Sequence, residues 1–171
     1  MCNSCANPPA RYLLSHRDIE ALDEAQDRLI IICPWLSEYA IDTELREKFE
    51  ALLKRKGRIA IGWGHLQDLT RGLTHRDVEP KGFYSALPKL KALGYTFPDQ
   101  VELKPLGTHE KYFVCDEEFA VIGSHTVLTS GINRQDRGLG LRTDDFQIIS
   151  DLIQRFESAP PFPLKMPFLN S

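Results

Sequence analysis

Short apolar runs with the length of buried strands alternate along this sequence with segments of helical spacing. The clearest run spans residues 29–33 and is stopped by Pro34. Further strands are expected at 58–62, 101–103, 111–115, 119–122 and 139–142. Strands that alternate with helices predict an α/β sandwich, in which helices cover both faces of one sheet. Residues 65–81 form a polar connector between these elements, of a length that is usually mobile or functional and that could rim a site.

Four apolar sets recur at helical spacing. They are Ile19, Leu22 and Ala25; Leu45, Phe49, Leu52 and Leu53; Phe83, Leu87 and Leu90; and Ile149, Leu152, Ile153 and Phe156. We expect the second helix to begin after Asp42 and to end at Gly57. The third helix should end at Gly94, and the fourth should open at Thr143 or Asp144.

The length of 171 residues suits a single domain, which at this size buries about 70% of its unfolded surface. We expect a disordered N-terminal segment at 1–14, the domain at 15–158 and a proline-rich extended tail at 159–171. No apolar run approaches the ~20 residues of a membrane span, and no secretory signal opens the chain. These features predict a soluble, cytoplasmic protein without membrane contact.

Charge and cysteine content narrow the class of protein further. A net charge of −3 disfavours a protein that coats nucleic acid by bulk attraction. Cys2 and Cys5 form a C-x-x-C pair, but no second ligand pair follows, so no metal site is expected. Cys33 and Cys115 lie in apolar runs and should be buried, reduced side chains.

One sequence pattern, which spans the apolar runs at 111–115 and 119–122, contains residue types suited to catalysis. His109, Lys111, Asp116, Gly123 and Ser124 form the pattern H-x-K-x4-D-x6-G-S. Residues two apart on a strand share a face, so the imidazole and the ammonium should point the same way. A phosphoryl group needs a fixed positive charge beside it, and a histidine can attack phosphorus or protonate the leaving oxygen. The spacing therefore indicates phosphodiester chemistry.

This string resembles the HKD motif of the phospholipase D superfamily, here THEKYFVCDEEFAVIGSHTVLTSG at residues 108–131. The segments LIIICPWLS, RIAIGWG and GLRTDD are similar to the framework of phospholipase D-like nuclease domains, and the likeness extends over residues 17–157. The resemblance implies the phospholipase D-like sandwich, with a mixed β-sheet covered by helices on both faces. It also implies a metal-independent reaction without a cofactor.

The chain has one H-x-K pattern, whereas two motifs meet at one site in this superfamily. The resemblance therefore implies a homodimer with a shared active site on its two-fold axis. His109 of one subunit would attack phosphorus, the partner's His109 would protonate the leaving oxygen, and Lys111 would hold nonbridging oxygens. Ser124 would donate a hydroxyl to the phosphate, while Asp116 should brace the hairpin beside Gly123.

Two positions depart from the family pattern. Thr126 stands where the motif usually has asparagine; it is expected to bind substrate through its hydroxyl, but the amide donor is lost from the phosphate site. Gly138 stands where a downstream glutamate often orients the histidine, with Asp136 as a substitute. Both departures should weaken catalysis.

Other residues could contact the substrate. Arg137 is the expected phosphate contact of a basic cluster that also contains Arg134 and Arg142. Trp63, between two glycines, could stack on a base or simply pack in the core. For His125 a structural role is favoured, and His16, His65 and His75 form no constellation.

Three functions are consistent with these residues. The first is a DNA endonuclease, with RNA as another substrate and a helicase or restriction system as a partner. The second is a noncatalytic phosphate- or nucleic-acid-binding or dimerisation module of a DNA-processing or defence system. The third is a phospholipase, which is disfavoured because no basic amphipathic helix for lipid access is evident.

Overall fold

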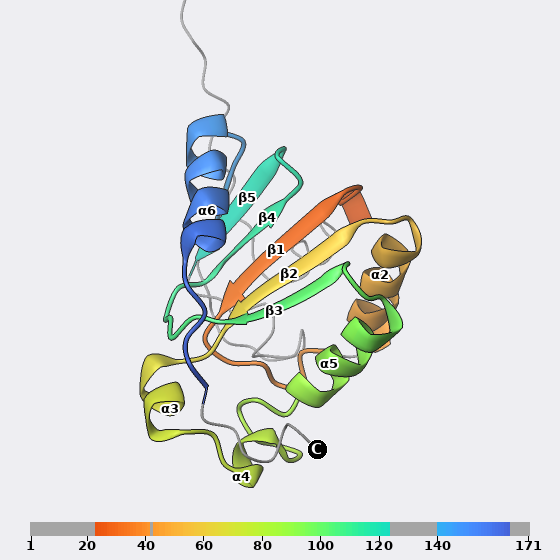
Figure 1. Cartoon of the computed structure of the whole chain (residues 1–171). Helices are drawn as coiled ribbons and strands as arrows, with labels where there is room; N and C mark the ends of the chain where they lie inside the picture. Colours follow the sequence, from red (N-terminus) through yellow and green to blue (C-terminus); the bar gives the residue numbers. More distant parts are fainter. Residues whose placement is uncertain (1–22, 42, 124–139, 165–171) are drawn as a thin grey trace, which may run out of the picture.

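A six-stranded sheet forms the centre of the computed structural model, which describes residues 23–41, 43–123 and 140–164. The strand order is β3-β2-β1-β4-β5-β6 (Figure 1). The strands are β1 (Arg28–Cys33), β2 (Arg58–Trp63), β3 (Val101–Pro105), β4 (Tyr112–Cys115), β5 (Phe119–Gly123) and β6 (Gly140–Thr143). The first three run parallel, and β4, β5 and β6 are antiparallel to their neighbours. The expected mixed sheet is confirmed.

The central strand β1 is apolar from Leu29 to Cys33 because both of its faces are covered. Leu29 and Ile31 belong to one hydrophobic core, and Ile30 and Ile32 to another. A strand buried on both faces needs an unbroken apolar run rather than an alternating one. The sequence of β1 is therefore explained by its place between two cores.

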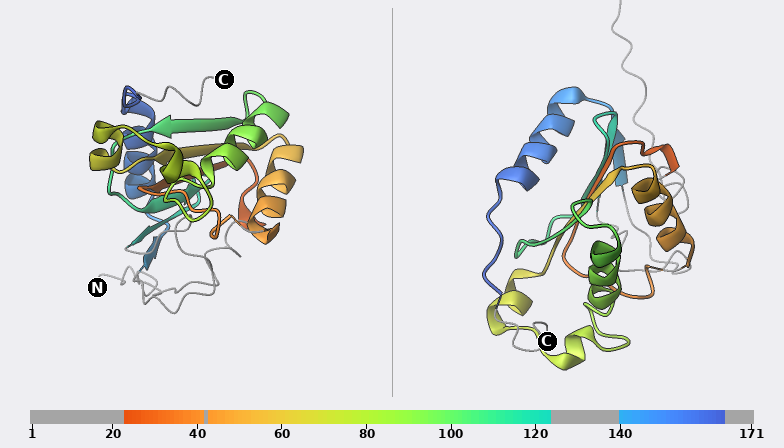
Figure 2. Two further views of the ribbon diagram at one scale, coloured as in Figure 1. Left: turned by 90° about the horizontal axis from the view of Figure 1, so that it is seen from below. Right: turned by 45° about the vertical axis from the view of Figure 1, so that its right-hand side comes forward.

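Three helices build those cores. Helices α2 (Thr43–Lys54) and α5 (Leu87–Thr96) cover one face of the sheet, and α6 (Phe146–Ser158) covers the other (Figure 2). Apolar faces at 3.6-residue spacing supply the contacts. The prediction of an α/β sandwich with helices on both faces is confirmed.

Helix α2 ends through a pair of backbone hydrogen bonds. The Lys56 N–H donates to Leu53 O (3.0 Å), and the Gly57 N–H donates to Leu52 O (3.1 Å). This is the Schellman arrangement, and its left-handed residue is Lys56, with φ of 74°. Gly57 follows it where a Cβ would collide with the Leu52 side chain. The helix therefore stops where expected.

Two other helix ends differ from the prediction. Helix α6 is capped by Asp145, whose Oδ1 accepts from the N–H groups of Gln147 (2.9 Å) and Ile148 (3.2 Å). Thr143 and Asp144 lie before this cap. Helix α5 continues past Gly94 to Thr96, because a glycine inside a helix costs only about 1 kcal/mol and does not end it.

The polar connector at 65–81 contains two short helices, α3 (Leu66–Arg71) and α4 (His75–Val78). They lie beyond the carboxyl ends of β1 and β2 (Figure 1). Each is too short to show a helical period in the sequence, so the sequence predicted the polar connector but not the helices within it.

The β4–β5 turn is tied to the start of β1 through one carboxylate. Asp116 accepts backbone N–H bonds from Gln26 (2.9 Å), Asp27 (2.9 Å) and Arg28 (2.7 Å). Its own N–H donates to Arg28 O (2.8 Å), and its φ is 51°, which aspartate tolerates better than most residues. Asp116 therefore braces the hairpin, as the sequence indicated.

Both cysteines of the described residues have the environment that was expected. Cys33 and Cys115 are both buried. Burial raises the pKa of the Cys115 thiol to about 12, with a smaller contribution from the Asp116 carboxylate. These thiols remain protonated and act as small apolar side chains.

The ends of the chain are described in part. Segment 1–14, most of the helix expected from Ser15 and residues 165–171 lie outside the described residues. The Phe162 N–H donates to Pro105 O (2.7 Å), and the side chains of Phe162 and Leu164 pack against the core. The beginning of the tail is therefore held on the domain. No helix in the described ranges is long and apolar enough to cross a membrane.

Asp116→Ala should lower the free energy of unfolding by about 2 kcal/mol, because three N–H groups at the start of β1 lose a charged acceptor. Urea denaturation followed by circular dichroism measures the change. Glu117→Ala removes an exposed carboxylate from the same turn and is the matched control, expected to change stability by less than about 0.5 kcal/mol. Equal losses in the two variants would contradict the bracing role.

Candidate active site

Three chain segments are joined by backbone hydrogen bonds just beyond the carboxyl ends of the parallel strands. The Gly64 N–H donates to Pro34 O (3.2 Å), and the Thr108 N–H donates to Gly64 O (2.7 Å). Gly64 has φ of 99°, and a Cβ there would lie 2.5 Å from Leu69 Cδ1. Only glycine fits this position, where the three segments approach one another.

The residues that follow these three, Trp35, His65 and His109, carry rings in mutual contact. Trp35 and His65 are stacked, with ring centroids 5.4 Å apart and planes 22° apart. His109 meets both rings edge to face, at 5.7 Å from Trp35 and 5.4 Å from His65. The backbone row thus places three side chains from distant parts of the sequence side by side.

Lys111 lies beside His109, as the spacing predicts. Its Nζ is 3.5 Å from His109 Nδ1 and 3.5 Å from His109 O. Both residues precede β4 rather than belonging to it, although the Lys111 carbonyl still accepts from the Gly123 N–H (3.1 Å). His109 is exposed and Lys111 is half-buried. An imidazole and an ammonium therefore meet at a solvent-accessible place beyond the carboxyl ends of the parallel strands.

Trp35 and His65 were not among the residues predicted for the site. Trp35 lies two residues after the end of β1 and His65 two residues after the end of β2. Ligands of open α/β sheets bind outside the carboxyl ends of the parallel strands. Position relative to the strand ends was therefore the signal that could have found both residues.

Trp63 does not line a groove. It is 2% exposed and packs in the core, with its ring centroid 5.7 Å from that of Tyr84. As the last residue of β2, it belongs to a strand covered on both faces, so its ring has no free face for a base. Of its two alternative roles, core packing is the one the structure supports.

The remaining predicted residues are placed in part. Gly123 ends β5 opposite Gly140. Arg142 already has two partners within the chain: its guanidinium lies 3.6 Å over the Phe119 ring and 3.0 Å from the Glu24 carboxylate. Ser124, His125, Thr126, Arg134, Asp136, Arg137 and Gly138 lie outside the described residues.

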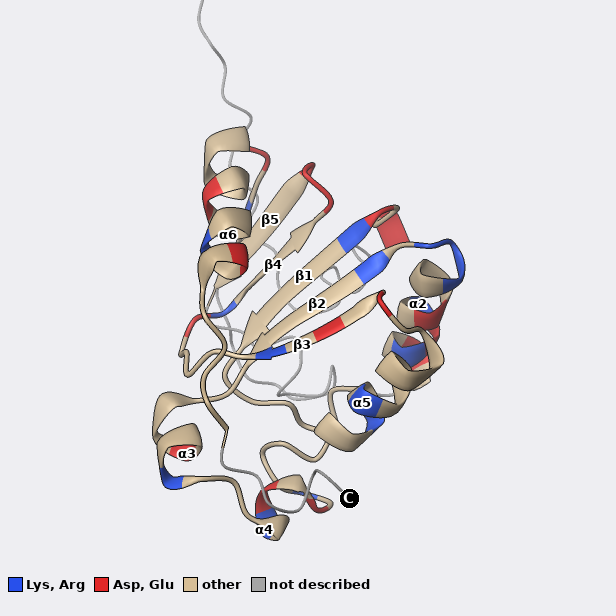
Figure 3. Ribbon diagram, in the orientation of Figure 1, with Lys and Arg blue, Asp and Glu red and all other residues tan. Residues whose placement is uncertain are grey.

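A second basic cluster, at the α2–β2 connection, lies at the opposite end of the parallel strands, where β2 begins. Lys54, Arg55, Lys56 and Arg58 gather where β2 starts (Figure 3). His109 and Lys111 lie beyond the end of this strand. The charged side chains of this cluster are therefore solvated at the far end of β2 and are too far from His109 to contact a phosphate there.

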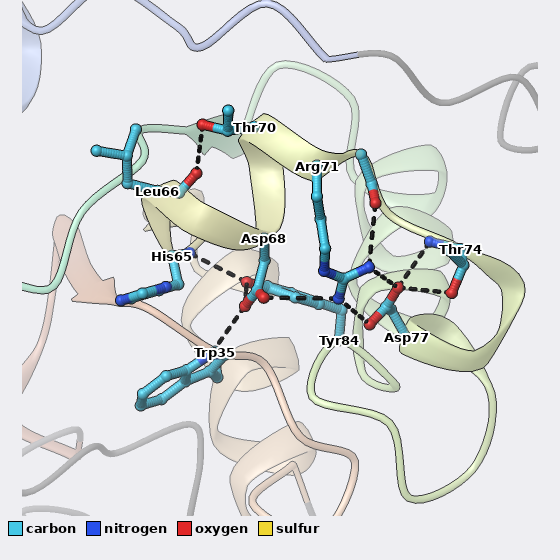
Figure 4. Close-up of polar contacts among 10 residues, drawn as sticks. Trp35, His65, Leu66, Asp68, Thr70, Arg71, Thr74, Asp77 and Tyr84 are labelled. Carbon is cyan, nitrogen blue, oxygen red and sulfur yellow. Dashed lines mark hydrogen bonds and ion pairs between the residues drawn. The ribbon is translucent and has the colours of Figure 1, made fainter.

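A polar network holds the Trp35 and His65 segments in place (Figure 4). Asp68 Oδ2 accepts from Trp35 Nε1 (3.2 Å) and from the Tyr84 hydroxyl (2.8 Å). The Tyr84 oxygen in turn accepts from the backbone N–H of His65 (3.0 Å). Burial raises the pKa of the Tyr84 phenol, which keeps it protonated as a donor to Asp68.

The network continues to the surface through Arg71. Its Nη2 lies 2.6 Å from Asp77 Oδ1 and 3.5 Å from Asp68 Oδ1. Asp77 also accepts from the N–H and the hydroxyl of Thr74, both at 2.7 Å. The hydrogen bond from Arg71 is the largest cause that lowers the pKa of Asp77, to about 2. Helices α3 and α4 are thereby joined by one ion pair.

Metal coordination has no candidate among the described residues. No group of three or more His, Cys, Asp or Glu side chains there could hold an ion. The chemistry available at this edge is that of two imidazoles, an ammonium and the surrounding rings.

Comparison with known proteins identifies the fold. No family model and no curated protein matches the sequence. NucT from Helicobacter pylori is similar in structure, with a TM-score of 0.61 and 14% identity over 89% of this chain and 96% of NucT. Nuc from Salmonella typhimurium, a phospholipase D family member, gives a TM-score of 0.58 and 10% identity over 84% of this chain and 87% of Nuc. This chain has the phospholipase D-like fold.

The same phospholipase D-like fold also occurs within a larger protein. TrmBL2, an archaeal chromatin protein with a novel mode of DNA binding, gives a TM-score of 0.52 and 16% identity over 84% of this chain and 46% of TrmBL2. NucT and Nuc, in contrast, match over nearly their whole length. The phospholipase D-like resemblance of the sequence is therefore confirmed at the level of the fold.

Gly64→Ala should destabilise the phospholipase D-like domain by about 2 kcal/mol or more, because it adds a positive-φ penalty and a collision with Leu69. Urea denaturation measures the loss. Gly94→Ala is the matched control, since a Cβ in that helical position meets Val101 at an ordinary 3.8 Å. That variant should gain up to about 1 kcal/mol. A neutral Gly64→Ala would contradict the role of the backbone row.

Asp77→Asn should cost about 1 kcal/mol of unfolding free energy at pH 7, after allowance for solvent around the half-exposed Arg71. Because the pKa of Asp77 is lowered on folding, the carboxylate stabilises the fold above pH 4 and loses this effect as the pH falls toward 2. Urea titrations at pH 7, 4 and 2.5 should show wild type and Asp77→Asn converging. A gap that stays constant with pH would exclude this ion pair as its source. Asp144→Asn, at an exposed carboxylate, is the control.

Proposed function

We propose that this protein is a metal-independent phosphodiesterase, and specifically a nuclease that cleaves DNA through a phosphohistidine intermediate. The observation that carries the proposal is the pairing of His109 with Lys111, 3.5 Å apart, at the carboxyl edge of a phospholipase D-like sheet. The imidazole supplies a nucleophile, and the ammonium supplies a fixed positive charge for the phosphate oxygens. DNA as the substrate is supported by the fold shared with TrmBL2, a protein that binds DNA.

In the first step, an unprotonated ring nitrogen of His109 attacks phosphorus. A nitrogen–phosphorus bond forms, and the bond to the departing oxygen breaks on the opposite side. That oxygen takes a proton from a second imidazole. Lys111 turns from the His109 ring to the nonbridging oxygens, since its ammonium has three donors to offer.

In the second step, water replaces the protein on phosphorus. The imidazole that gave up its proton now takes one from the attacking water, and the nitrogen–phosphorus bond breaks. His109 and a phosphomonoester are released. Because one imidazole must begin unprotonated and the other protonated, the rate should fall at both low and high pH.

The second imidazole is assigned to the partner subunit of a homodimer. His65 lies closer in the chain's own fold, but its ring touches that of His109 directly at 5.4 Å between centroids. In-line displacement needs the proton donor on the far side of the phosphate, and rings in contact leave no room for a phosphate between them. A symmetric dimer with His109 of each subunit facing across its axis meets this requirement.

A noncatalytic phosphate-binding or dimerisation module is the second candidate. Within the described residues, the ring of His109 contacts Lys111, Trp35 and His65 and no carboxylate. In the sequence, Gly138 and Thr126 replace the glutamate and asparagine of the motif. Loss of the motif's glutamate and asparagine makes the histidine a poorer nucleophile, and these two replacements favour binding without turnover.

Plasmid nicking in excess EDTA separates the two candidates. Wild type should cut without metal, and His109→Ala should lower the rate at least about 100-fold. His75→Ala, at an exposed imidazole on α4, should match wild type. Mass spectrometry of the wild type quenched during turnover should find phosphate on His109. Nicking by His109→Ala at the wild-type rate would overturn the enzymatic proposal.

The shared site is tested with mixed subunits. Wild type should have the mass of a dimer in solution, and an excess of His109→Ala should inhibit it, since a mixed dimer holds one competent imidazole. Unchanged activity per wild-type subunit in the mixture would contradict a site on the two-fold axis.

A further inference from the structure

We propose that the Phe83 ring, held against Trp35, stacks on an unpaired nucleobase next to the phosphate at His109. The substrate would then be single-stranded nucleic acid or an unpaired end. This inference rests on the proposed nuclease function and names the form of its substrate.

Phe83 is a large apolar ring at the surface, with 60% of its area exposed. Three other aromatic rings of the described residues are exposed to a similar extent, namely Tyr39, Tyr95 and Phe146. Exposure alone therefore decides little. Phe83 differs from them because its ring contacts Trp35, with centroids 5.8 Å apart, and Trp35 contacts His109.

The Phe83 segment is fixed relative to the end of β1. The Leu36 N–H donates to Phe83 O (2.8 Å), and the Ala86 N–H donates to Leu36 O (2.9 Å). Trp35 itself is anchored through its Nε1 to Asp68 (3.2 Å), as Figure 4 shows. A ring held this firmly loses little conformational entropy when a ligand stacks on it.

The position of Phe83 relates it to the reaction site. Phe83 and His109 both contact the Trp35 ring, with centroid distances of 5.8 Å from Trp35 to Phe83 and 5.7 Å from Trp35 to His109. A base lying on Phe83 therefore belongs to a nucleotide at or next to the phosphate that His109 would attack. The stacking site and the phosphate site can hold one strand together.

An aromatic ring can stack only on a base whose face is free. In a duplex, each base is covered by its neighbours on both sides, whereas an unpaired base offers its face. Stacking is also independent of sequence and of charge. It would supply affinity that a chain with a net charge of −3 does not obtain from bulk attraction.

Binding of short single-stranded oligonucleotides by fluorescence anisotropy tests the inference. The probes are an oligothymidylate and the same strand with an abasic nucleotide at each position in turn. Phe83→Ala should weaken binding of the intact strand about 5- to 100-fold and leave binding of the strand abasic at the critical position unchanged. Phe83→Tyr should restore the affinity. The exposed side chain makes misfolding of these variants unexpected, and circular dichroism verifies their folds.

Tyr95→Ala removes an exposed ring near the far end of α5 and should bind like wild type. The inference is overturned if Phe83→Ala weakens intact and abasic strands equally, if Tyr95→Ala has the same effect, or if duplex binds as tightly as single strand. If the wild type showed no nicking activity in any assay, only the nuclease proposal would be contradicted. In that case, the difference between intact and abasic strands would still report base stacking.

Discussion

The backbone hydrogen bonds that Gly64 makes to Pro34 and Thr108 are the constraint on which the candidate site depends. They join the chain after β1, the chain after β2 and the chain before β4 at one point. Each of these segments then presents its next residue, so backbone geometry brings the three side chains of the site together. A glycine is required because the φ of 99° and the nearby Leu69 exclude a Cβ.

Packing, rather than a carboxylate, positions His109 within the described residues. Its ring lies edge-on to Trp35 and His65, and both of those residues are held by the Asp68–Tyr84 network. An aromatic contact is worth about 1 kcal/mol, less than a charge-assisted hydrogen bond. These contacts therefore orient the His109 imidazole through packing.

Elements with a strong local signal were predictable. The central strand β1 followed from its apolar run, and the bracing role of Asp116 followed from its place in the hairpin turn. The suggestion that Trp63 could stack on a base failed for a geometric reason. The part of β2 from Ile59 to Trp63 is buried, so a residue that reaches a ligand at this end comes after the strand has ended. His65 was missed because helices α3 and α4 are too short to reveal where the connector leads.

The contact of Asp116 with the start of β1 spans 88 to 90 residues of sequence. On the ribosome, β1 emerges early and can pair with β2, but its other edge stays open until the hairpin has been synthesised. An apolar strand with an open edge invites pairing with other chains. The nascent polypeptide thus passes through a prolonged aggregation-prone stage, during which chaperone protection would matter more than it does for the finished domain.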